Sequence, residues 1–141
     1  MLSIILSACV LVALTMHIHA SGIAVLLRGL MKLEALPPTR VWAITRMLLG
    51  MIWWIILIHL AEISVWALFY LWRGCMPNAE AAFYFSGVTY TTIGYGDLVL
   101  TKPWRLLGPI EGLVGILMCG LSTGYFFAIV SYIHQSRNRG T

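Results

Sequence analysis

The chain has 141 residues and a formal net charge of +4; 60% of its residues are hydrophobic and 10% are charged. A soluble domain is about 45–50% apolar and about 25% charged, so this composition excludes a free-standing soluble enzyme and a disordered tail. The nine Lys and Arg residues are scattered, which excludes a basic nucleic-acid-binding stripe. The length and composition predict one all-α membrane domain.

The first apolar run, Leu2–Leu27, is interrupted by polar Ser, Thr and His residues. A helix needs about 20 apolar residues to cross a bilayer core, so residues 1–30 are predicted to form an N-terminal transmembrane helix. Residues 31–40 are predicted to form a cytoplasmic linker to the next helix.

The second run, 41–72, predicts an outer helix about 48 Å long, which must tilt or project its ends into water. Ionisable residues within spans are usually paired and functional, and His17, His19, His59 and Glu62 all lie within the first two runs. His17 and His59 fall at similar predicted depths, and Glu62 lies one turn away. We expect His17, His59 and Glu62 to form a polar contact that joins the first helix to the second. The alternative is that His59 and Glu62, at i and i+3, pair only with each other.

A short segment follows that cannot span a membrane. Ala79–Tyr90 is apolar and aromatic, and Asn78 before it is a typical N-cap, with Glu80 in the first turn. Residues 78–90 are therefore predicted to form a re-entrant half-helix.

The third long run predicts an inner helix over 105–133, with Glu111 in its outer third, near the half-helix. Residues 135–141 are predicted to form a cytoplasmic tail. We expect Glu111 to brace the loop that follows the half-helix, with Arg105 as a possible partner.

The basic residues are distributed unequally between the two predicted sides of the membrane. Because basic residues accumulate in cytoplasmic loops, the richer side is predicted to be cytoplasmic and the N-terminus external. The richer side holds Arg28, Lys32, Arg40, Arg46, Arg137 and Arg139, and the other holds Arg73, Lys102 and Arg105.

The sequence Thr-Thr-Ile-Gly-Tyr-Gly-Asp at 91–97 resembles the selectivity filter of potassium channels. It follows a half-helix and lies between two spans, so the resemblance covers about two thirds of the chain, from Val41 to Ile133. It implies a pore domain over 41–134 with one extra N-terminal helix, assembled as a homotetramer.

The resemblance also implies roles for individual residues. The backbone carbonyls of Thr92, Ile93, Gly94 and Tyr95, with the Thr92 hydroxyl, are expected to bind K⁺, the transported ion. Thr91 belongs to the same loop, and Gly94 and Gly96 are expected to take positive φ. The side chains of Ile93 and Tyr95 are expected to point away from the ions and pack against the half-helix.

Some positions depart from one common pattern of the family. Val88 stands where some members carry a glutamate that bonds to the filter aspartate. Tyr84 stands where a tryptophan often partners that aspartate, so a bond from Tyr84 to Asp97 is expected instead. Inner helices of the family often bend at a glycine, and Gly115 and Gly120 are the candidates here; the alternative is that these glycines allow close packing of helices.

The resulting hypothesis is passive potassium conduction in the cell membrane, most like that of small bacterial pore-only channels, without catalysis. Membrane lipids are the expected surroundings, with no nucleic acid, no soluble partner and no cofactor besides K⁺. One alternative is a subunit of a potassium-uptake system, although such proteins carry four degenerate filter copies in one long chain. Another is a non-conducting or regulatory subunit that requires a partner.

Overall fold

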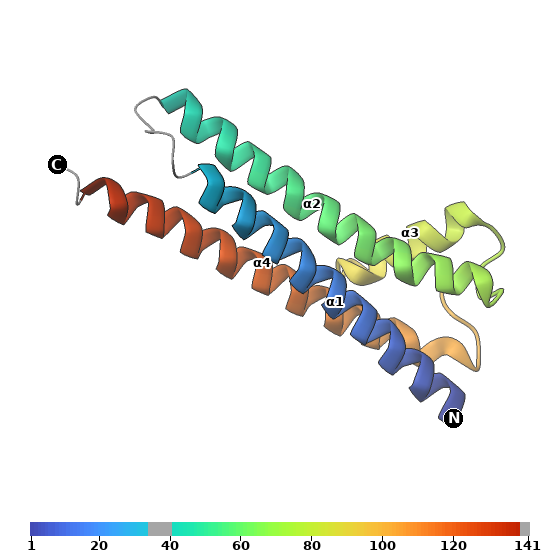
Figure 1. Cartoon of the computed structure of the whole chain (residues 1–141). Helices are drawn as coiled ribbons and strands as arrows, with labels where there is room; N and C mark the ends of the chain where they lie inside the picture. The colour runs from blue at the N-terminus through green and yellow to red at the C-terminus, as the bar shows by residue number, and fades with distance from the viewer. Residues whose placement is uncertain (34–40, 139–141) are drawn as a thin grey trace.

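A computed structural model describes residues 1–33 and 41–138 (Figure 1). It confirms an all-helical fold. Three of its helices are long and apolar enough to cross a membrane, over Leu2–Leu30, Trp42–Trp72 and Trp104–Tyr132. The elements in chain order are α1 (Leu2–Leu33), α2 (Val41–Trp72), α3 (Ala79–Tyr90), the 3₁₀ turn η1 (Trp104–Leu106) and α4 (Leu107–Asn138).

The helix bounds differ from the predicted ones mainly at the end of α4. The helix continues to Asn138, past the last apolar residue at Ile133, because the end of a membrane helix can project into water. The predicted tail at 135–141 is therefore helical over its first four residues, 135–138. Most of the predicted linker (residues 34–40, with Arg40) and Arg139 lie outside the described residues.

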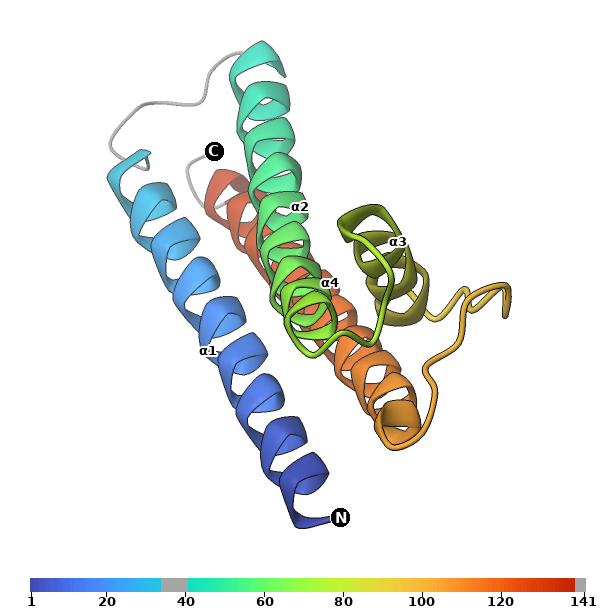
Figure 2. The ribbon, with the colours of Figure 1, turned by 90° about the vertical axis from the view of Figure 1, so that its right-hand side faces the viewer.

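The short helix α3 and the long helix α1 lie on opposite sides of the α2–α4 pair (Figure 2). The N-terminus of α1 lies at the end of the molecule where α2 connects to α3, and the C-terminal end of α4 lies at the opposite end (Figure 1). The exposed basic residues Arg28 and Arg46 belong to that opposite end.

One stripe of α1 is buried against the rest of the chain. Its members recur every three or four residues, which places them on one face of a helix. They are Ile4, Ala8, Leu11, Thr15, His19 and Ile23.

Close backbone approach and hydrogen bonds hold α1 against α2. A Cβ added at Gly22 would lie 2.6 Å from the Ile58 side chain. The indole N–H of Trp54 donates to the Gly22 carbonyl at 2.8 Å, and that of Trp66 donates to the Thr15 hydroxyl at 3.0 Å. Hydrogen bonds between membrane helices add to packing by about 0.6 kcal/mol each. The extra helix is therefore docked in one register and rotation.

Aromatic packing joins α2, α3 and α4 at the end of the molecule that holds α3. Tyr70 meets Phe85 of α3 edge-on at 5.3 Å, and Phe69 meets Trp104 at 5.5 Å. The Arg73 guanidinium lies 4.7 Å from the Trp104 ring centre, a cation–π contact at the end of the core.

The start of α3 is fixed by its cap. Asn78 is extended, and its side-chain Oδ1 accepts the Ala81 N–H at 2.8 Å. Glu80 lies in the first turn, where the helix dipole favours a negative charge.

Candidate functional site

In the loop after α3, the backbone angle φ is positive at every second residue. Thr92, Gly94 and Gly96 have φ of 60°, 53° and 79°. Thr92 is the one non-glycine residue with positive φ within residues 1–33 and 41–138. Glycine takes this region without strain, whereas a threonine there must be held by its surroundings. The sequence predicted positive φ at the two glycines and missed it at Thr92.

Hydrogen bonds to the last turn of α3 hold this strained start of the loop. The Thr92 N–H donates to the Thr89 carbonyl at 2.9 Å, and the Gly94 N–H donates to the Val88 carbonyl at 3.0 Å. Thr91 donates its N–H at 3.1 Å and its hydroxyl at 2.7 Å to the Gly87 carbonyl. Val88 therefore supports the loop through its backbone, and the end of α3 sets the loop conformation.

A second bond ties the far end of the loop back to α3. The Tyr84 hydroxyl donates to Asp97 Oδ2 at 2.7 Å, the pairing expected from the resemblance. This bond to a carboxylate raises the pKa of the Tyr84 phenol above its ordinary value. The loop is thus held at both ends by the same helix.

The side chains of the loop do not pack as expected from the sequence. Ile93 and Tyr95 were expected to lie against the half-helix, but they are 56% and 71% exposed in the single chain. These two side chains are therefore mostly uncovered within the single chain.

The inner helix α4 passes very close to the C-terminal end of α3. A Cβ added at Gly115 would lie 2.0 Å from the Tyr90 carbonyl oxygen, and one at Gly112 would lie 3.4 Å from that of Thr89. Gly120 has no such neighbour within 4 Å. Gly115 therefore has a packing role, which was the alternative to a hinge.

Glu111 joins three helices behind the loop. Its two carboxyl oxygens accept hydroxyls from Tyr70 of α2 at 2.7 Å and Ser86 of α3 at 2.5 Å. Glu111, Ser86 and Tyr70 are all fully buried. Glu111 of α4 braces α2 and α3 through these two hydroxyls. The partner suggested from the sequence, Arg105, is exposed.

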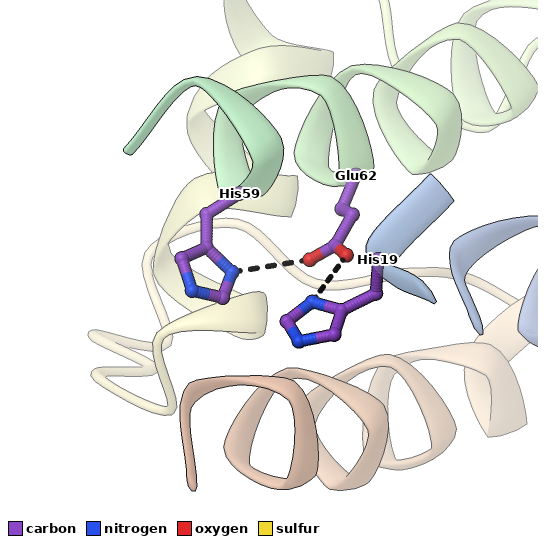
Figure 3. Close-up of side chains that lie close together, drawn as sticks. All are labelled: His19, His59 and Glu62. Carbon is purple, nitrogen blue, oxygen red and sulfur yellow. Dashed lines mark hydrogen bonds and ion pairs between the residues drawn. The ribbon is translucent and has the colours of Figure 1, made fainter. Parts of the chain in front are cut away.

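Glu62 is the centre of a second buried polar group. His19 Nδ1 of α1 lies 2.9 Å from one carboxyl oxygen, and His59 Nδ1 lies 3.1 Å from the other (Figure 3). The Tyr90 hydroxyl donates to the same carboxyl group. Ser122 of α4 lies 3.2 Å from His59 Nε2. All four α-helices therefore meet at this cluster.

The structure joins α1 to Glu62 through a different histidine from the one expected. His17 is exposed, whereas His19 is 3% exposed and contacts the carboxyl group. Two residues correspond to a turn of about 200° around a helix, so His17 has a suitable depth but lies on the wrong face. The alternative pairing of His59 with Glu62 is present as well.

Sequence reasoning missed the hydroxyls that partner the two buried carboxyl groups. Ser86 and Tyr90 are four residues apart on α3 and share its buried face. That spacing was visible in the sequence and would have pointed both toward the same side of the predicted half-helix.

The sequence model of a family described as ion channel matches residues 56–132, more than half of the chain. The potassium voltage-gated channel protein shk-1 of Caenorhabditis elegans is 33% identical over 69 residues, 45% of this chain and 13% of that protein. The chain thus spans a small part of that relative's length, and no solved structure matches. The chain is a multi-pass membrane protein that belongs to the ion channel family.

Proposed function

We propose that this protein conducts K⁺ passively and selectively through the loop at 91–97. The observation that carries the proposal is positive φ at every second residue, 92, 94 and 96. In an ordinary strand successive carbonyls point to opposite sides. A change of the φ sign at every second residue turns them to the same side, where a row of oxygens replaces the hydration shell of the ion.

The binding oxygens are assigned to the carbonyls of Thr92, Ile93, Gly94 and Tyr95, with the Thr92 hydroxyl. The resemblance at 91–97 and the potassium channel matched over 69 residues support K⁺ as the cargo. Tyr84 and Asp97 tie the loop to α3 and support the width of the filter.

A homotetramer is part of the proposal. One loop supplies oxygens on one side only, and irregular backbone at membrane depth is stable only where protein buries it or where it lines water. Ile93 and Tyr95 are more than half exposed, so we assign their cover to the adjacent subunit. Closed cyclic symmetry of four copies encloses a pore.

We infer that α4 lines the inner pore over residues 116–127, with Gly120 as the remaining hinge candidate. The N-terminus is assigned to the outside and the C-terminus to the cytoplasm. Arg28 is near the end of α1 and Arg46 near the start of α2, and these helix ends lie opposite the connection of α2 to α3 (Figure 1). The resemblance to small bacterial potassium channels favours a bacterial inner membrane.

The test is the reversal potential of the purified protein in planar bilayers, first under a K⁺ gradient and then with K⁺ opposed to Na⁺. We expect reversal close to the K⁺ equilibrium potential. Gly94→Ala places a Cβ at φ of 53°, which costs about 1–2 kcal/mol in each subunit, and should abolish selectivity. Gly50→Ala, on the open surface of α2, is the matched control and should leave it unchanged.

Equal permeability to Na⁺ and K⁺ in the unmodified protein would contradict the assignment of the filter. Absence of current from a tetramer whose size is verified in detergent would favour the non-conducting subunit. A requirement for a second transport protein would favour a component of an uptake system.

A further inference from the structure

We propose that His19, His59 and Glu62 form a binding site for a divalent transition metal ion, with Zn²⁺ as the best fit. The ligand atoms of the three residues all lie within 4.8 Å of one another. They come from α1 and α2, and each histidine ring faces one of the two Glu62 carboxyl oxygens (Figure 3). The ligands are side chains of α1 and α2 and not the oxygens of the loop at 91–97, so metal binding can be measured without measuring K⁺ conduction.

The donor set selects the class of metal. Two imidazole nitrogens with one carboxylate suit zinc and its neighbours, whereas Mg²⁺ and Ca²⁺ prefer oxygen ligands throughout. In a tetrahedral site with ligands at about 2.0–2.1 Å, the ligand atoms lie about 3.3 Å apart. The distances from Glu62 oxygens to the two Nδ1 atoms, 2.9 and 3.1 Å, are close to this spacing. The fourth position falls to the Tyr90 hydroxyl, 3.0 Å from His59 Nδ1, or to a water molecule.

The surroundings of His59 fit a metal ligand. A histidine that binds a metal through one ring nitrogen donates its other N–H to a nearby acceptor, which fixes the ring. Here His59 Nε2 lies 3.2 Å from the Ser122 hydroxyl, which can accept that N–H. The same contact with donor and acceptor exchanged serves the metal-free protein, so binding needs no rearrangement of α4.

The other histidine is held less completely. His19 Nε2 is buried and has no hydrogen-bond partner among the described residues, which is rare for a buried polar atom. Its ring is therefore fixed through Nδ1 alone. His19 also lines a groove of about 290 Å³ between α1 and α4, with Met118 and Tyr125 on the opposite wall.

An ion at this site acts on the base of the filter. The Tyr90 hydroxyl contacts both Glu62 and His59, and Tyr90 is the last residue of α3 before the loop at 91–97. Because a bound cation takes the carboxyl group as its own ligand, it changes the hydrogen bonding of Tyr90.

The test is metal binding by the purified, full-length protein without a polyhistidine tag, using Co²⁺ as a spectroscopic probe and Zn²⁺ as competitor. We expect one tetrahedral Co²⁺ per chain, displaced by Zn²⁺. His19→Ala and His59→Ala should each weaken binding by about tenfold or more. His17→Ala, which removes an exposed histidine from the same helix, is the matched control and should have no effect.

The unmodified protein gives a second measurement, which tests the site even if the histidine variants fail to fold. Its thermal midpoint should rise with added Zn²⁺ and return after chelation. Absence of both the Co²⁺ spectrum and this rise would overturn the site. A cobalt–thiolate band, or equal losses in His17→Ala and His19→Ala, would overturn it too. None of these readouts depends on current, so failure of the metal site and failure of K⁺ conduction are distinguishable.

Discussion

Replacement of Gly115 by alanine should separate α4 from the end of α3. The added Cβ would lie 2.0 Å from the Tyr90 carbonyl oxygen, and such contacts are essentially never shorter than 3.0 Å, so the gap must open by about 1 Å. Over-packing of this kind destabilises by about 1–3 kcal/mol. Alanine also favours a helix over glycine by about 1 kcal/mol, which hides part of the effect.

Gly120→Ala removes that ambiguity. It makes the same chemical change in the same helix, but nothing lies within 4 Å of the new Cβ. The difference in stability between the two variants therefore isolates the over-packing, and we expect Gly115→Ala to be the less stable by about 1–3 kcal/mol. The assay is denaturant unfolding in detergent micelles, followed by tryptophan fluorescence.

The same pair of variants should also differ in ion selectivity. The atom displaced by Gly115→Ala belongs to the last residue of α3, which holds the start of the filter loop. Selectivity for K⁺ over Na⁺ in planar bilayers should fall in this variant and persist in Gly120→Ala. Equal unfolding midpoints for the two variants would refute the close approach, whatever the currents show.

Two predictions concern groups outside the spanning helices. Because Tyr84 donates to Asp97, the raised pKa of the Tyr84 phenol should fall in Asp97→Asn. The titration is followed by phenolate absorbance, with Tyr84→Phe identifying the Tyr84 signal. An unchanged titration would mean that the bond does not form. The stabilising bond is complete below the ordinary tyrosine pKa of about 10 and is lost as the pH rises through the higher folded value. Burial raises the pKa of the Cys75 thiol and Arg73 lowers it, so Arg73→Gln should slow maleimide labelling at pH 8 with the other two cysteines replaced by serine. Faster labelling would contradict this electrostatic assignment.

The sequence by itself determined the local structure and its chemical character. A long apolar run can satisfy its backbone hydrogen bonds in a bilayer only as a helix. The bounds of α2, Val41 and Trp72, could therefore be predicted from hydropathy alone. The Asn78 cap and the positive φ of Gly94 and Gly96 could also be predicted, because each depends on neighbouring residues in the sequence. The Tyr84–Asp97 pairing came from resemblance to the potassium channel family.

Only the tertiary structure decided which polar residues meet. Depth along a helix follows from counting residues, but rotation about its axis depends on the packed face, so His19 rather than His17 reaches Glu62. The partners of Glu111 likewise lie on helices far apart in sequence, and periodicity does not pair one helix with another. Thr92 has positive φ because its N–H donates to the Thr89 carbonyl at the end of α3. Threonine itself does not favour positive φ, so this conformation could not be predicted from the residue type.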